Sequence, residues 1–255
     1  MGKNKLKKFR DMETFDCVFQ CPFAQLKADG FPLKGKWASH FGNDNPIVVE
    51  LGCGKGEYTI GLSRRYPDRN FIGIDIKGAR MWTGASQAHR EQLANVAFLR
   101  TSIELLPHFF GAGEVSEFWI TFPDPQMKKS SKRLTSTRFL DLYRQVSGDN
   151  PVVNLKTDSP FLYTYTRRLV IANGLELLDD TPDLYATHIG NDILSIRTFY
   201  EQQWLDRGLS IQYLRFVLNH STPLVEIDDS DIERDSYRSF SRGQIQQPHL
   251  FNREQ

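Results

Sequence analysis

Short apolar runs alternate with longer amphipathic stretches along the chain after Pro46. The runs IVVEL, FIGID, VAFLR, FWITF and VVNLK have the length and composition of buried strands. Each is followed by a segment with helical spacing of apolar residues, and we expect helices near 57–65, 79–92, 103–108, 136–146 and 160–172. Strands that alternate with helices predict a parallel sheet, because each helix carries the chain back along a face of the sheet.

The segments at the two ends differ from this pattern. After Gly174 we expect a strand LELLD, a helical stretch near 198–207 and a strand IQYLRFVL that closes the sheet as an antiparallel hairpin. The predicted fold is therefore Rossmann-like α/β, with a mostly parallel seven-stranded sheet and helices on both faces. Residues 1–45 are expected to form a loose basic arm and an irregular cap, 46–220 the α/β domain, and 221–255 a polar, acidic tail that is extended or weakly ordered.

Composition excludes several classes of protein. The chain has 255 residues, of which 40% are apolar and 25% charged, so a disordered chain is excluded. No apolar run exceeds four residues, and no secretory signal follows the basic start, so we expect a cytoplasmic protein that does not cross a membrane. The three cysteines, Cys17, Cys21 and Cys53, do not suggest a disulfide framework or a zinc site, and no metal is predicted.

The net charge of +1 conceals a polarised distribution. Two basic patches consist of Lys3, Lys5, Lys7, Lys8 and Arg10, and of Lys128, Lys129, Lys132, Arg133 and Arg138. The balancing acids lie near the C-terminus, at Glu226, Asp228, Asp229, Asp231, Glu233 and Asp235. An isolated basic run is usually a solvated surface, but two runs together with a nucleotide-type loop favour a nucleic-acid partner.

A glycine loop follows the first predicted strand of the domain. Gly52, Gly54 and Gly56 alternate where the chain turns from strand to helix, which requires close backbone approach and often a positive φ. A tight packing turn is the alternative. Two acids favour ligand binding, since Glu50 precedes the loop and Asp75 ends the next strand, where a carboxylate can accept both hydroxyls of a ribose. The pattern predicts an adenosine-bearing ligand.

The loop spacing distinguishes two such ligands. It reads G-C-G-K-G and not the G-x-G-x-x-G of dinucleotide sites, which argues against a nicotinamide oxidoreductase. An acid just before the loop repels pyrophosphate but attracts the positive charges of S-adenosylmethionine. We therefore expect S-adenosylmethionine as the cofactor.

A second motif, Phe122-Pro123-Asp124-Pro125, follows the fourth strand of the domain at the carboxyl edge where ligands bind in open α/β folds. A plain proline turn is the alternative. Two prolines restrict the position of Asp124, which suits a group that orients a reacting base, and the basic stretch that follows can hold phosphates.

With these motifs the chain resembles the bacterial tRNA (guanine-N7)-methyltransferases of the TrmB family, which have the class I S-adenosylmethionine-dependent fold. The resemblance covers roughly residues 45–218. It rests on VVELGCGKGEY, NFIGIDIKG, FPDPQMKKSSKRL, LKTDSPF and the late Thr198-Phe199-Tyr200-Glu201.

The resemblance implies roles for individual residues. Glu50 and Asp75 would bind the donor, Asp124 would sit between donor and target base, and Lys128, Asp158, Thr198 and Glu201 would contact RNA. The family usually has an aspartate after the third strand, where this chain has Thr101 and Ser102, either of which would supply the adenine contact. Gln126 stands where the family commonly has a tryptophan.

The implied activity is methyl transfer from S-adenosylmethionine to N7 of the variable-loop guanosine, position 46, of tRNA. The implied partners are tRNA and the donor, and no obligate protein partner is evident. Two alternatives remain open at this point: an RNA-binding protein on the same fold without catalysis, and a methyltransferase for another acceptor. The two basic patches argue against a protein or small-molecule acceptor.

Overall fold

The computed structural model describes residues 2–187, 193–206 and 208–236. One sheet runs through this part of the chain, in the strand order β1-β4-β3-β2-β5-β6-β8-β7. Its strands are β1 (Val18–Gln20), β2 (Ile47–Leu51), β3 (Asn70–Ile74), β4 (Val96–Arg100), β5 (Val115–Thr121), β6 (Ser147–Thr157), β7 (Leu177–Thr181) and β8 (Gln212–Val217). Neighbouring strands are parallel except at β8, which is antiparallel to both β6 and β7. The parallel core and the closing hairpin are confirmed.

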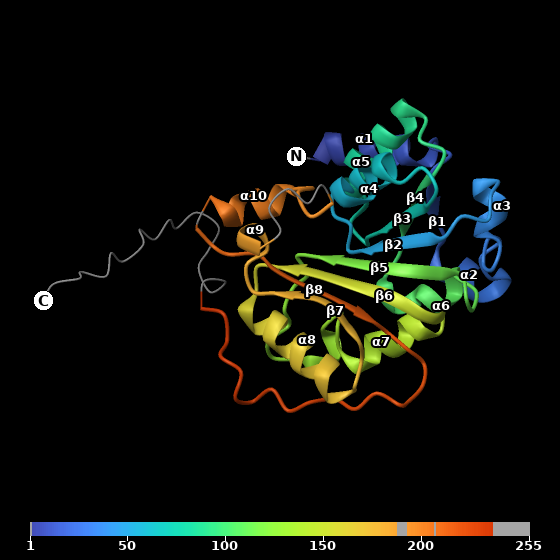
Figure 1. The fold of residues 1–255 in the computed structure, drawn as a ribbon. Helices are drawn as coiled ribbons and strands as arrows, with labels where there is room; N and C mark the ends of the chain where they lie inside the picture. The colour runs from blue at the N-terminus through green and yellow to red at the C-terminus, as the bar shows by residue number, and fades with distance from the viewer. Residues whose placement is uncertain (1, 188–192, 207, 237–255) are drawn as a thin grey trace, which may run out of the picture.

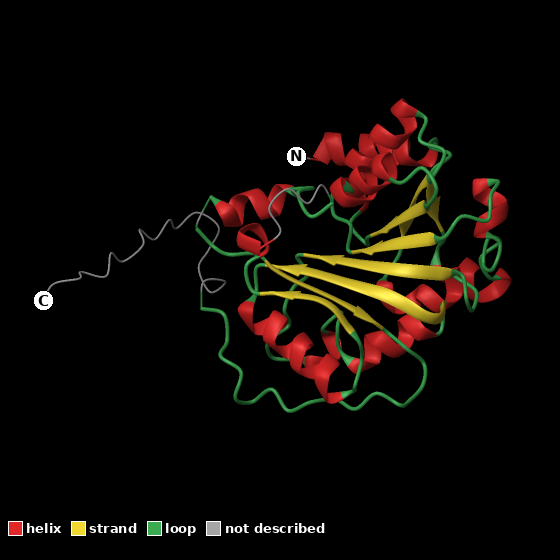
Figure 2. Ribbon diagram, in the orientation of Figure 1, coloured by secondary structure: helices red, strands yellow, loops and turns green. Residues whose placement is uncertain are grey.

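Helices cover both faces of the sheet, as predicted (Figures 1 and 2). On one face lie α1 (Gly2–Glu13), α4 (Glu57–Arg65) and α5 (Gly78–Glu91); on the other lie α6 (Leu106–Phe109), α7 (Thr137–Arg144) and α8 (Pro160–Ala172). The short α2 (Phe23–Asp29) and α3 (Trp37–Phe41) lie at one end of the sheet, and α9 (Leu184–Thr187) and α10 (Phe199–Leu205) at the other. The second end is the one to which β5 and β6 point, so α9 and α10 lie at the carboxyl edge (Figure 1).

The prediction of seven strands and a loose N-terminal arm was wrong. β1 adds an eighth strand by pairing in parallel with β4, and α1 packs along α5. Met12 is 1% exposed, and the indole of Trp82 on α5 donates to Asp11 at 3.0 Å. β1 has only three residues and α1 buries only one narrow face, so the periodicity of both is too weak to be recognised from sequence. Both elements are defined by the surfaces of β4 and α5 on which they pack.

The C-terminal strap, which we define as residues 221–236, is extended and follows the outside of α7 and α8 (Figure 1). Acidic side chains of the strap accept hydrogen bonds from α8 and from the residue that caps it. Glu226 accepts from the Tyr165 hydroxyl at 2.6 Å, and Asp235 accepts from the Ser159 hydroxyl at 2.5 Å and from the Phe161 amide at 3.1 Å. The rest of the predicted tail, 237–255, lies outside the described residues. The expected division of the chain after residues 45 and 220 stays a prediction.

No described helix is long and apolar enough to pass through a bilayer.

Candidate active site

The glycine loop connects β2 to α4 and contains three alternating glycines in the left-handed region. Gly52, Gly54 and Gly56 have φ of 78°, 57° and 76°, as the pattern predicts. A Cβ atom on Gly52 would meet nothing within 4 Å, whereas one on Gly56 would lie 2.8 Å from the ring of Phe98. The first part of the loop therefore faces open space, and the last glycine lets α4 pack against the sheet.

Glu50 is buried beneath this loop. Its Oε2 accepts from the Thr59 amide at 2.8 Å and from the Thr59 hydroxyl at 2.6 Å, and its Oε1 accepts from the Thr121 hydroxyl at 3.0 Å. Burial raises the pKa of Glu50 from 4.5 to about 7, against these hydrogen bonds, which favour the charged form. A cation brought near this carboxylate would restore its charge, which suits the positively charged end of S-adenosylmethionine.

Asp75 follows β3 and is hydrogen-bonded to the glycine loop. Its Oδ2 accepts from the Gly54 amide at 2.9 Å and its Oδ1 from the Lys77 amide at 2.7 Å. Each carboxylate oxygen can accept a second hydrogen bond, so both remain able to receive the hydroxyls of a ribose. The loop and this acid hold each other in place.

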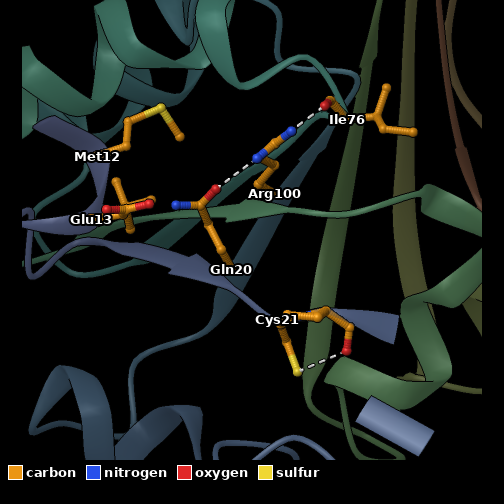
Figure 3. A pocket seen from close by; sticks show the side chains of 8 residues that line it. Met12, Glu13, Gln20, Cys21, Ile76 and Arg100 are labelled. Carbon is orange, nitrogen blue, oxygen red and sulfur yellow. Dashed lines mark hydrogen bonds between the residues drawn. The ribbon is translucent and has the colours of Figure 1, made fainter. Parts of the chain in front are cut away.

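An open pocket of about 600 Å³ has in its wall Ile76, the residue after Asp75 (Figure 3). Ile76 and Arg100 line it from the carboxyl ends of β3 and β4, and the Arg100 guanidinium donates to Gln20 at 2.9 Å. The remaining wall comes from the N-terminal segment, at Met12, Glu13, Val18, Gln20, Cys21 and Pro22. Sequence reasoning missed this wall, because only the pairing of β1 with β4 brings the segment here.

Thr101 and Ser102 follow Arg100 at the end of β4. Thr101 is buried, and the hydroxyl of the half-buried Ser102 lies 3.5 Å from a carboxylate oxygen of Glu104. Their place beside the pocket suits an adenine contact from either residue.

The Pro-Asp-Pro loop follows β5 and holds Asp124 at the surface. Phe122 and Gln126, on either side of the loop, have φ of 50° and 47°, values that side chains with a Cβ rarely adopt. Pro123 and Pro125 are buried, Asp124 is exposed, and its Oδ1 accepts from the Gln126 amide at 3.0 Å. Strain of this kind, about 1–3 kcal/mol for each residue, concentrates at functional sites. The restriction of Asp124 in position stays a prediction.

The basic stretch after this loop offers fewer free cations than its sequence suggests. Lys132 and Arg138 both pair with Glu104, at 2.9 and 3.1 Å. Arg133 is buried over the rings of Phe161 and Tyr165. Lys128 and Lys129 are exposed, and no ion pair among the described residues involves either of them. The surface offered to a polyanion is therefore centred on these two lysines.

The other residues that the resemblance assigns to RNA are all buried. Asp158 directly follows β6 and is 1% exposed. The next residue, Ser159, caps α8 by accepting from the Leu162 amide at 3.0 Å. Thr198 and Glu201 form a reciprocal capping box at the start of α10. Glu201 is fully buried.

The candidate residues therefore divide into two groups. In the first group, the glycine loop follows β2, Asp75 follows β3, Asp124 follows β5 and Asp158 follows β6. These four strands are adjacent in the sheet, so their carboxyl ends meet at one edge, as the predicted topology requires. Thr198 and Glu201 lie at this edge on α10, with their side chains turned inward. Among the described residues no group of three or more histidine, cysteine or acidic side chains is placed to hold a metal ion.

Comparison with known proteins assigns the chain to a family. The family model Methyltransf_4, described as "Putative methyltransferase", matches residues 44–214. The tRNA (guanine-N(7)-)-methyltransferase of Bacteroides fragilis is 56% identical over 243 residues, which cover 95% of this chain and 96% of that protein. The enzyme of the same name from Porphyromonas gingivalis is 59% identical over 92% of this chain and 98% of its own length. The one from Oceanobacillus iheyensis is 34% identical over 70% of this chain and 83% of its own.

Solved structures support the fold. The 16S rRNA methyltransferase KamB superposes with a TM-score of 0.56 at 14% identity, over 72% of this chain and 93% of that one. A 30S ribosomal A1408 methyltransferase from an uncultured bacterium gives 0.53 at 16% identity, over 72% and 97%. At these identities the likeness establishes the class I methyltransferase architecture, and the order of strands around β2 agrees with it.

Proposed function

The chain belongs to the tRNA (guanine-N(7)-)-methyltransferase family, and on that premise we propose that it transfers the methyl group of S-adenosylmethionine to N7 of a guanosine in tRNA. The observation that carries the proposal is the placement of Asp124. This acid follows β5, the strand paired with β2, whose end begins the glycine loop. The donor loop and the Asp124 carboxylate are thus neighbours at one edge of the sheet.

The chain's own residues have separate tasks toward the donor. Gly52 and Gly54 leave room for it, Asp75 accepts the ribose hydroxyls, and Glu50 offsets its positive charge. The pocket lined by Ile76 and Arg100 receives the adenine, next to Thr101 and Ser102. When bound, S-adenosylmethionine supplies the electrophilic methyl group.

The acceptor side needs orientation more than acid–base chemistry. Guanine N7 carries an in-plane lone pair, so its attack removes no proton and needs no strong general base. Asp124 aligns the base and offsets the positive charge that develops on the purine, with Asp158 beside it at the next strand. Lys128 and Lys129 bind phosphates of the tRNA, which is recognised largely by shape. No metal takes part in this scheme.

We further propose that the acceptor is the variable-loop guanosine at position 46 and that the enzyme works in the cytoplasm, where tRNA is found. Two transcripts of one tRNA, with guanosine or adenosine at position 46, test the site. The purified chain is expected to incorporate labelled methyl groups only into the first, as 7-methylguanosine. Equal incorporation into both transcripts would refute position 46, and no incorporation into either would refute the activity.

A further inference from the structure

Lys156 is a cation enclosed in the protein, two residues before Asp158 on β6. Its side chain is fully buried, as is that of Glu201, and the Nζ atom lies 2.6 Å from Glu201 Oε1. Nζ also donates to the Tyr58 hydroxyl at 2.9 Å and to the Leu194 carbonyl at 2.8 Å. Burial lowers the pKa of Lys156 to about 8, although the Glu201 carboxylate acts in the opposite direction.

Lys156 connects three separate parts of the chain. Tyr58 lies in the first turn of α4, directly after the glycine loop, and Lys156 itself leads to the end of β6. Leu194 and Ile196, whose carbonyls lie 2.8 and 3.3 Å from Nζ, belong to the turn that precedes α10. One buried cation therefore joins the helix that follows the glycine loop, the strand that precedes Asp158 and the turn at the carboxyl edge.

Glu201 has all of its contacts inside the protein. Its Oε1 receives Lys156 and the Tyr185 hydroxyl, and its Oε2 receives the Thr198 amide at 3.2 Å. A fully buried carboxylate with these donors offers no surface to RNA. The exposed side chains of the same turn are Ser195 and Arg197, and the Arg197 guanidinium lies over the Tyr185 ring at 5.1 Å.

Resting on the function proposed above, we propose that Lys156 is a positioning residue for tRNA: with Glu201 it holds the turn 194–198 in the place where its outer side meets the substrate. Buried ion pairs contribute little net stability but can fix geometry, because each charged group requires its partner. In this role Glu201 and Thr198 do not contact tRNA themselves but hold the turn in place, and Arg197 is the exposed side chain that the turn directs toward tRNA. The Lys156 side chain is itself fully buried, so in this role it acts through the turn.

The test measures steady-state methylation of tRNA by wild type, Lys156→Met, Glu201→Gln and the double variant, with donor affinity measured separately. For Lys156→Met we expect the KM for tRNA to rise on the order of tenfold to a hundredfold while the Kd for S-adenosylmethionine stays within about twofold. A purely structural role would lower the apparent kcat by loss of folded protein and leave the KM for tRNA unchanged. Leu169→Ala, on the buried face of α8, is the control for general destabilisation.

The double variant separates stability from positioning. Removing both charges leaves no unpaired buried ion, so its stability is expected to exceed that of Lys156→Met. The KM of the double variant for tRNA should remain high, because the Leu194 and Ile196 carbonyls still lack their donor.

A double variant that regains both the stability and the KM of wild type would overturn the proposal. An unchanged KM for tRNA in Lys156→Met would also overturn it. Failure of the wild type to form 7-methylguanosine would instead refute the underlying function.

Discussion

The carboxylate of Asp229, in the C-terminal strap, lies against the guanidinium of Arg133, a side chain that is only 1% exposed. The same guanidinium lies over the rings of Phe161 and Tyr165 and donates to the Gln126 and Met127 carbonyls, both at 3.3 Å. The strap thus neutralises a buried cation directly beneath the loop that carries Asp124. Part of the basic stretch belongs to the protein's interior, where it supports the loop.

Replacing Asp229 by alanine is expected to destabilise the fold by about 2–3 kcal/mol, because the buried guanidinium loses its counter-charge. Denaturant unfolding measures the change. The matched control is Asp231→Ala, which removes an ion pair with Arg168 in which both side chains are exposed, and which should cost under about 1 kcal/mol. Equal losses in the two variants would contradict the buried role of Arg133.

Exposure also predicts which lysines bind RNA. Lys128→Ala and Lys129→Ala should each weaken tRNA binding and reduce the slope of log affinity against log salt by about 1, since each removes one phosphate contact. Lys132→Ala should change the slope less, because Glu104 already neutralises that ammonium at 2.9 Å. Binding measured across a salt series distinguishes the three variants. A full effect at Lys132 with none at Lys128 would show that the phosphate-binding surface lies elsewhere.

Glu50 predicts a pH dependence of stability. Its pKa is about 7 in the folded protein, against 4.5 for an ordinary glutamate, so between these values the unfolded chain has released a proton that the folded chain keeps. Stability therefore falls as pH rises from about 4.5 to 7 and stays reduced above that range. Relative to wild type, Glu50→Gln should gain roughly 3 kcal/mol between pH 4.5 and pH 8. Parallel stability curves for the two proteins would refute the raised pKa.

The charge of Glu50 should also determine how tightly the protein binds S-adenosylmethionine. Because a cationic ligand favours the ionised carboxylate, the affinity of wild type for S-adenosylmethionine is expected to rise with pH from about 5 to 8 and then level off. Titration calorimetry in two buffers of different ionisation enthalpy would detect the proton released on binding near pH 6. Glu50→Gln should bind more weakly and release no proton.

The glycine loop gives a prediction with an internal control. Gly52→Ala and Gly113→Ala both place a side chain at positive φ, 78° and 79°, with no atom within 4 Å of the new Cβ. Each should cost about 1–2 kcal/mol of stability from backbone strain alone. Only Gly52→Ala should also lose donor affinity, since its methyl group enters the space above the loop. Equal donor affinity in the two variants would show that the ligand does not approach Gly52.

The elements that were predicted correctly are those in which local pattern and tertiary structure agree. The strand 47–51 and the helix 57–65 have the predicted bounds, because a β-branched run, three glycines and an amphipathic stretch follow one another without ambiguity. The donor residues Glu50 and Asp75 came from the same pattern, since strand ends at one edge converge by topology. Their individual roles still await measurement.

What the sequence left undetermined depends on contacts between distant segments. The position of β1 follows from the exposed edge of β4, and the burial of Arg133 follows from a strap that returns from the C-terminus. In the sequence Lys156 is an ordinary strand residue, and its pairing with Glu201 depends on the position of α10 in the folded chain. Charge runs show how many cations a segment holds, and only the folded chain shows which of them face water.

The central claim is that Asp124 orients a guanine of tRNA for methyl transfer. The most direct test compares wild type with Asp124→Asn for methyl transfer from labelled S-adenosylmethionine to unmodified tRNA, with identification of the modified nucleoside. We expect 7-methylguanosine from wild type and a loss in kcat of about a hundredfold or more in the variant, with unfolding and donor affinity close to wild type. An Asp124→Asn protein that methylates guanine N7 at the wild-type rate would contradict the account.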